Sequence, residues 1–216
     1  MAEGERQVPS YLRLTAQYRT DRDGRSIPPG WDDNPTTWPK RIALAVLALI
    51  GLIVAFYLAL FQLSALYFTQ LNLDVVEHVW DPFFHSYEVL DYLHWPDAIP
   101  GILAYGGELA LNFVGDRNRW HTAPWAVIAF GLIIFPAAGI SVILLMAQAL
   151  AVGSWCSLCI VSAVVSFVIC GLGADEVLAT LQHLKRVRDS GDSLIRALWG
   201  EGLKGLVPIT TRKGED

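Results

Sequence analysis

The sequence GSWCSLC, residues 153–159, opens the last long apolar run of the chain, which extends to Gly173. It holds two of the three cysteines, Cys156 and Cys159. Residues three apart in a helix have Cβ atoms about 5–6 Å apart, close enough for a disulfide once the first turn adjusts. The pair can therefore open and close as a two-electron couple, and a helix N-terminus favours a reactive thiolate. The alternative is that both cysteines are small packing residues of a membrane helix.

The composition indicates an integral membrane protein. Of the 216 residues, 53% are hydrophobic and only 17% are charged, unlike an ordinary soluble domain. The first forty residues are mostly polar, and the apolar run after them is too long for a signal peptide, so we expect none that is cleaved. The surroundings we expect are membrane lipid, with no nucleic-acid partner.

The distribution of positive charge predicts the topology. All sixteen Lys and Arg residues fall within residues 6–41, at positions 117 and 119, or from residue 185 onward. Residues 64–100 hold six acidic residues and no basic one. By the positive-inside rule the three basic clusters share the cytoplasmic side and the acidic loop lies outside. We therefore expect an even number of spans, with both termini in the cytoplasm.

Apolar runs predict an all-α, polytopic membrane protein with a four-helix bundle. The first run has 22 residues without a charge, close to the roughly 20 that cross the hydrocarbon core. Its helical pattern continues toward Leu71, and Pro136 is expected to kink the third helix. The predicted spans are residues 42–63, 98–114, 124–151 and about 154–173.

Three regions are predicted along the chain. Residues 1–38 form a polar cytoplasmic arm, partly ordered at best, residues 39–185 the membrane domain, and residues 186–216 a cytoplasmic tail. Within the membrane domain, residues 72–97 are rich in aromatic side chains, and we expect this outer loop to pack as a cap.

The C-terminal part of the chain is expected to remain helical beyond the last span. From Ala174 the sequence predicts a cytoplasmic amphipathic helix that Gly191 ends. Residues 193–199 predict a second short helix on the membrane surface.

Glu108 is predicted near mid-membrane, about ten residues from the outer end of the second span. An ionisable group at that depth is a functional candidate. The alternative is a protonated glutamate that is hydrogen-bonded inside the bundle. A transporter or an ion channel is a further alternative, supported only by Glu108 and the small residues of the spans.

No metal site is predicted. The outer loop contains His78, His85 and His94, which could in principle join the cysteine pair, but no tight His-x-x-x-His spacing exists. Cys170 lies eleven residues after Cys159, at the opposite end of the same helix, and is expected to be inert.

Taken together, these features resemble the vitamin K epoxide reductase family over about residues 39–185. The shared features are four spans, an acidic outer loop after the first, and a Cys-x-x-Cys pair opening the fourth at the outer surface. The segment PDAIPGILAY is similar to the start of the family's second span, where an Asn, a Gly and a Tyr recur. The matching residues here are Asp97, Gly101 and Tyr105.

The resemblance implies a membrane thiol oxidoreductase in the cytoplasmic (inner) membrane of a bacterium. Such a protein passes electrons from protein thiols, often through a thioredoxin-like or other thiol partner on the outer side, to a quinone such as menaquinone or ubiquinone. Cys159 would face the quinone, and Cys156, the more exposed sulfur, would exchange with incoming thiols. The residues that this reading assigns to the quinone are Asp97, Gly101, Tyr105 and Ser162.

The chain departs from the family at several positions. Two loop cysteines that relay electrons in the family are matched by His78 and Ser86. A partner dithiol would then attack Cys156 directly; the alternative is a non-catalytic subunit of a larger membrane complex. Ala163, next to Ser162, replaces a ring-contacting residue, which argues against vitamin K epoxide itself as the substrate.

Overall fold

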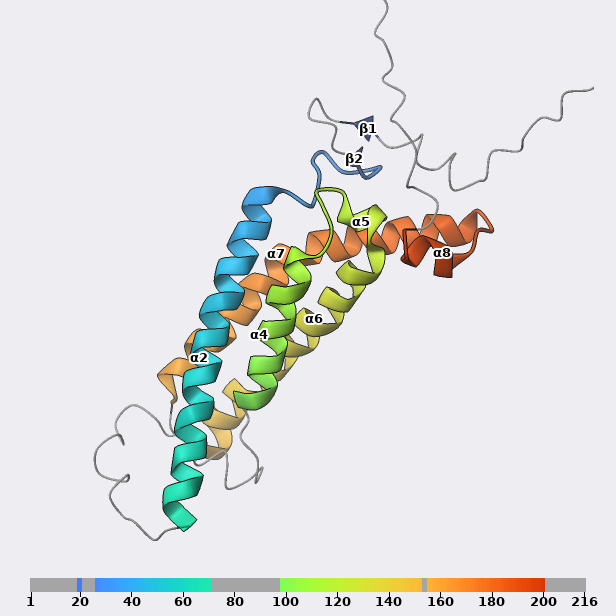
Figure 1. Cartoon of the computed structure of the whole chain (residues 1–216). Coiled ribbons are helices and arrows are strands. Elements are labelled where there is room, and N and C mark those ends of the chain that lie inside the picture. Colours follow the sequence, from blue (N-terminus) through green and yellow to red (C-terminus); the bar gives the residue numbers. More distant parts are fainter. Residues whose placement is uncertain (1–18, 21–25, 71–97, 153–154, 201–216) are drawn as a thin grey trace, which may run out of the picture. The chain divides into compact units, whose positions relative to one another are not determined.

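The computed structural model describes residues 19–20, 26–70, 98–152 and 155–200, which are mostly helical (Figure 1). The elements are β1 (Arg19–Thr20), β2 (Ser26–Ile27), α2 (Trp38–Gln70), α4 (Ala98–Phe113), α5 (Arg119–Thr122), α6 (Pro124–Ala147), the π-helical turn η1 (Gln148–Val152), α7 (Ser157–Asp189) and α8 (Leu194–Leu198). The expected outer cap, with His78, His85, His94 and Asp97, lies outside the described residues.

Within the described residues, three helical segments are long and apolar enough to cross a membrane: Trp38–Leu60, Pro124–Leu150 and Ser157–Asp189. They coincide with the first, third and fourth predicted spans. The second predicted span is the helix α4, but its 16 residues extend only about 24 Å at 1.5 Å per residue. That is shorter than the hydrocarbon core of about 30 Å, so the second span, and with it the count of four spans, stays a prediction.

Helix α2 starts with Pro39 in its first turn, where a missing N–H costs nothing and φ is already set for a helix. Its buried face carries four small residues beside Leu44 and Leu58, and its exposed face carries large apolar ones, which is the arrangement of a helix surrounded by lipid. The small buried residues are Ala48, Gly51, Ala55 and Ala59. The large exposed ones include Ile42, Val46, Ile50, Ile53, Phe56 and Leu60.

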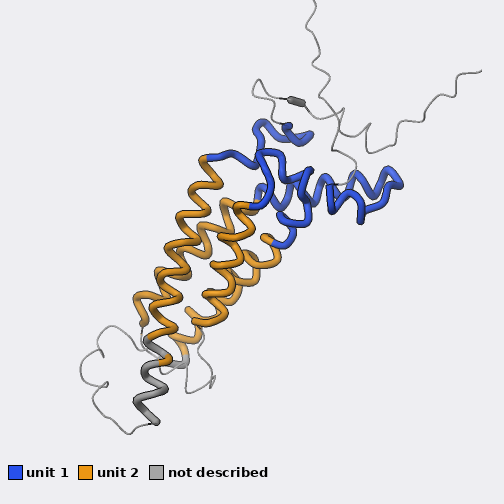
Figure 2. The backbone as a smooth tube through the Cα atoms, viewed as in Figure 1, with its two compact units in different colours: residues 1–38, 114–129, 175–216 blue, residues 39–113, 130–174 orange. Residues whose placement is uncertain are grey.

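The described chain divides into two compact units, coloured separately in Figure 2. Unit 1 comprises residues 1–38, 114–129 and 175–216, and unit 2 comprises residues 39–113 and 130–174. The three regions predicted from the sequence, 1–38, 39–185 and 186–216, stay a prediction.

Unit 2 is a bundle of most of α2, all of α4 and the adjoining parts of α6 and α7. Its helices approach closely where one of them has a glycine. A Cβ built on Gly51 of α2 would overlap the ring of Tyr105 from α4. A Cβ on Gly173 of α7 would lie 2.7 Å from Phe130 and 2.9 Å from Ile134 of α6. Pro136 lies inside α6, which remains helical to Ala147.

Unit 1 contains a buried polar cluster. The guanidinium of Arg119, only 1% exposed, forms two bonds to the Glu176 carboxylate, Nε to Oε1 at 2.5 Å and Nη2 to Oε2 at 2.7 Å. The Thr36 hydroxyl donates to the same Oε1 at 2.8 Å. These are charge-assisted bonds in a bidentate geometry, so the buried carboxylate is well compensated. The segment from Ser26 to Thr36 is therefore ordered by specific contacts.

The histidine His121 is buried in the same unit. Its Nε2 lies 2.5 Å from the Ser26 hydroxyl, and its ring meets Trp120 edge-on with centroids 4.5 Å apart. Burial, and secondarily the nearby His183, lowers the pKa of His121 to about 3. His121 is therefore a neutral part of the core at physiological pH.

The C-terminal helices agree with the sequence. Helix α7 continues as a single helix to Asp189, well past the apolar run. Gly191, with φ of +79°, follows its end in the left-handed conformation that glycine adopts without strain. The short helix α8 follows Ser193 as predicted. Their position relative to a membrane stays a prediction.

Candidate redox site

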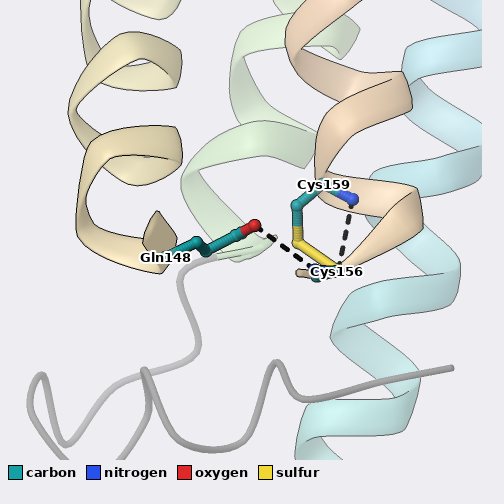
Figure 3. The surroundings of a disulfide bond; sticks show 3 residues. All are labelled: Gln148, Cys156 and Cys159. Atoms are coloured by element: carbon teal, nitrogen blue, oxygen red, sulfur yellow. Dashed lines mark hydrogen bonds between the residues drawn. A yellow bond between two sulfur atoms is a disulfide. The ribbon is translucent and has the colours of Figure 1, made fainter. Parts of the chain in front are cut away.

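The two cysteines lie at the N-terminus of α7 and form the disulfide shown in Figure 3. Their Cα atoms are 5.2 Å apart. The helix begins at Ser157, and the carbonyl of Cys156 accepts the first intrahelical bond, from the N–H of Ile160 at 3.1 Å. Cys156 is therefore the N-cap residue of α7, and Cys159 is one turn further along.

The two sulfurs differ in their surroundings. The backbone N–H of Cys159 points at the Sγ atom of Cys156, at 3.2 Å, in the way an N–H normally donates to an N-cap side chain. The positive end of the helix dipole acts at the same place. When the disulfide opens, Cys156 is therefore the better placed of the two to hold negative charge.

Burial does not follow the sequence expectation. Cys156 is 2% exposed, packed with Leu58, Ala59 and Ala98, whereas Cys159 is only partly buried. The expectation that Cys156 is the more exposed sulfur is therefore wrong for this state of the protein. The reason is that the N-cap position faces α2 and α4, which cover it.

Cys159 lies in the wall of a cavity of about 130 Å³ in unit 2. The wall is mainly apolar, and three of the four predicted quinone residues, Gly101, Tyr105 and Ser162, lie in it with Cys159. The fourth, Asp97, lies outside the described residues. The other lining residues are Ala55, Leu58, Ala98, Pro100, Ala104, Ala137, Ile140, Ser141, Leu144, Leu145, Gln148, Ala163 and Ser166.

The polar part of this wall is organised by Tyr105. Its hydroxyl lies 2.8 Å from the carbonyl oxygen of Ser162, from the hydroxyl of Ser162 and from the hydroxyl of Ser166. A carbonyl can only accept, so Tyr105 donates to it and its oxygen accepts from a serine hydroxyl. Tyr105 therefore joins α4 to α7 directly beside the cavity.

Two residues of the site were not predicted from the sequence. The Oε1 atom of Gln148 accepts the N–H of Cys156 at 3.3 Å, and Gln148 is buried in the cavity wall (Figure 3). It belongs to the π-helical turn η1, a feature common at functional sites. The signal in the sequence was that Gln148 is the one amide side chain of the uncharged run of residues 124–151. For Ser166 the signal was its position four residues after Ser162, on the same helix face.

Known proteins were compared with this chain by family, by sequence and by structure, and the family comparison gives a match. The model of the vitamin K epoxide reductase family matches residues 42–173. No curated protein and no solved structure matches the chain. The match covers more than half of the sequence and includes both cysteines and every described residue of the cavity wall. The chain therefore belongs to the vitamin K epoxide reductase family.

Proposed function

We propose that this protein is a membrane thiol–disulfide oxidoreductase that passes electrons from protein thiols, through Cys156 and Cys159, to a quinone. The single observation that supports this most is the position of Cys159 in the wall of an apolar cavity, beside its disulfide partner. A redox-active sulfur at an apolar cavity can meet a lipid-soluble electron acceptor, while its partner exchanges with another thiol.

The size and chemistry of the cavity fit a quinone head group. An apolar cavity of about 150 Å³ is known to accept benzene, so about 130 Å³ is the scale of one six-membered ring. The Ser162 hydroxyl and the Gln148 amide in the wall provide donors for quinone carbonyls. The proposed acceptor is menaquinone or ubiquinone, with the carbonyl-bearing ring in the cavity and the rest of the molecule, including the isoprenoid tail, in lipid.

The proposed reaction balances in two stages. A partner dithiol attacks the disulfide, a mixed disulfide forms, and the second partner thiol leaves Cys156 and Cys159 reduced. The S–S bond then forms again between Cys156 and Cys159, and the two electrons released reduce the quinone, which takes up two protons as quinol. Gln148 and Tyr105 position the pair and the ring.

We infer that the electron donor is a thioredoxin-like or other thiol protein on the outer side of a bacterial inner membrane. The family's relay cysteines are matched here by His78 and Ser86, which favours direct attack on Cys156. Because Cys156 is 2% exposed, the partner must displace part of its cover when it docks. Both termini lie in the cytoplasm in this proposal.

The test uses the full-length protein in lipid nanodiscs with a small dithiol and a short-chain quinone. The unmodified protein is expected to form quinol, and Cys156→Ser or Cys159→Ser to form none. With the native partner present, Cys159→Ser is expected to trap a mixed disulfide on Cys156, visible on a non-reducing gel. If the unmodified protein forms no quinol and neither variant forms an adduct, the non-catalytic subunit becomes the better interpretation.

A further inference from the structure

Glu108 lies one helical turn beyond Tyr105 on α4 and is 1% exposed. Among the residues that the structure describes, its Oε2 atom has no hydrogen-bond partner, although the atom is shielded from solvent. The proposed reaction as written above makes no use of this carboxyl group. A carboxyl buried to this degree with an unpartnered oxygen needs an explanation.

Glu108 is part of a buried polar stripe on α4, with Tyr105 before it and Asn112 after it. Residues at this spacing share one helix face, and those three apart have Cβ atoms about 5–6 Å apart. Glu108 is close enough to interact electrostatically with Tyr105 and with the Cys170 thiol of α7. The stripe leads from the cavity wall toward the end of α4 where Asn112 bonds to Arg41.

The surroundings of Glu108 favour its neutral form. Within unit 2, the described part of α6 has no titratable residue, and the charged residues of α2 are confined to Lys40 and Arg41 at its start. Arg41 directs its guanidinium to the carbonyl oxygen of Asn112. Burying an unpaired carboxylate is unfavourable, and the acid avoids this cost by keeping its proton.

The reduced cysteine pair supplies only one of the two protons that the proposed reaction needs at the cavity. Quinol formation needs two protons, but a reduced pair with Cys156 as the thiolate carries only one, on Cys159. The N-cap position of Cys156, with the Cys159 N–H aimed at its sulfur, favours that singly protonated pair. A second proton must therefore come from another group.

We propose that Glu108 supplies this second proton, through the hydroxyl groups of Tyr105 and Ser162, to a quinone oxygen. The proposal rests on the quinone reduction proposed above. The hydroxyl oxygens of Tyr105 and Ser162 lie 2.8 Å apart, and Ser162 lies in the cavity wall. The two hydroxyls form the last part of the route when the Tyr105 proton turns from the Ser162 carbonyl to the Ser162 hydroxyl.

The step balances in atoms and charge. The Cys156 thiolate, the Cys159 thiol, the Glu108 acid and the quinone become the disulfide, the Glu108 carboxylate and the quinol. The electron pair comes from S–S bond formation, one proton comes from Cys159 and the other from Glu108. The negative charge moves from sulfur to carboxylate, and water then restores the proton on Glu108.

The test compares Glu108→Gln, which keeps the shape but has no acidic proton, with Glu108→Asp, which keeps the acid. Quinol formation is expected to fall by about 10²- to 10⁴-fold in Glu108→Gln, the usual loss for a proton donor, and to recover in part in Glu108→Asp. The KM for quinone should stay within about twofold, because the residue does not line the cavity. The pH profile and solvent isotope effect of kcat should change in Glu108→Gln.

Two further measurements separate this inference from the proposed function. Reduction of the disulfide by the dithiol, followed by thiol labelling, should proceed equally in all three proteins. Infrared difference spectra on electrochemical reduction of a bound short-chain quinone need no thiol turnover, and should show the Glu108 acid C=O band disappearing. A protein that lacks this band change, or a Glu108→Gln variant with unchanged kcat and pH profile, overturns the inference. Absence of dithiol-driven quinol formation with the band change intact counts against the proposed function instead.

Discussion

Two buried glutamates, one in each unit, have opposite surroundings. Glu176 of unit 1 receives two bonds from Arg119 and one from Thr36. Glu108 of unit 2 is equally buried, but its Oε2 has no partner among the described residues. A carboxylate saturated in this way keeps its charge and holds segments together. A buried carboxyl without a cation favours its neutral form, and in the inference above it supplies its proton to the quinone.

The largest expected effect comes from breaking the ion pair of unit 1. Arg119→Ala removes the guanidinium and leaves the Glu176 carboxylate buried without a countercharge, so we expect a loss of about 3–5 kcal/mol in unfolding free energy. Denaturant unfolding in detergent micelles measures it. Arg117→Ala is the matched control, because Arg117 is exposed two residues away, and should change stability by less than about 0.5 kcal/mol. Equal effects of the two substitutions would contradict the structural role of Arg119.

Acid should weaken unit 1 through His121. Its folded-state pKa of about 3 lies below the ordinary value of 6.5, so the unfolded chain binds this proton first as the pH falls. Stability is therefore full above pH 6.5 and declines as the pH falls toward 3. By pH 5 the loss is about 2 kcal/mol, at 1.36 kcal/mol per pH unit. Unfolding curves measured at several pH values for the parent and for His121→Gln should show a shallower decline in the variant.

A close contact in unit 2 gives the next effect. Gly51→Ala would place a methyl group against the Tyr105 ring, and overpacking of this kind costs about 1–3 kcal/mol. Gly106→Ala is the matched control in the same bundle, because a Cβ there meets nothing within 4 Å. We expect only Gly51→Ala to lower the thermal midpoint and to weaken quinone binding, measured by quenching of tryptophan fluorescence. A similar decrease in both variants would show that the Tyr105 contact is not responsible.

The smallest stability effect is expected for Glu108→Gln. A neutral amide replaces a neutral acid of the same shape, so the unfolding free energy should change by no more than about 1 kcal/mol. Glu176→Gln, the same substitution in the ion pair, should cost several times more. Side-by-side denaturant curves decide the point, and a large loss in Glu108→Gln would mean that Glu108 is a structural residue after all.

The elements that the sequence predicted well are those marked by a long run of residues of one kind. The apolar runs of α2, α6 and α7 exceed the length of a span, and Gly191 marks the end of α7. The contact between Arg119 and Glu176 joins residues 57 apart and leaves no periodic pattern. Arg119 was interpreted from its charge alone, as a marker of the cytoplasmic side.

The residues that line the cavity of the candidate site could be named in part from the sequence, but their geometry could not. Cys156, Cys159, Gly101, Tyr105 and Ser162 were named from spacing and from the family resemblance. The expectation that Cys156 is the more exposed sulfur did not include the cover that α2 and α4 place over the N-cap position. The π-helical turn that brings a buried amide to the cysteines depends on how α6 ends, and no residue pattern in that run signals it.

Because α2 and α4 cover Cys156, the thiols of the cell differ in how readily they can reduce the disulfide. Exchange with a thiol requires the attacking sulfur to approach the disulfide directly, and a sulfur atom at a buried N-cap offers that approach to a freely diffusing small thiol only when the cover opens by itself. A protein that spends binding energy on moving the cover reaches the sulfur faster. The site therefore slows the leakage of electrons from the abundant small-thiol pool and favours electrons from a docked donor.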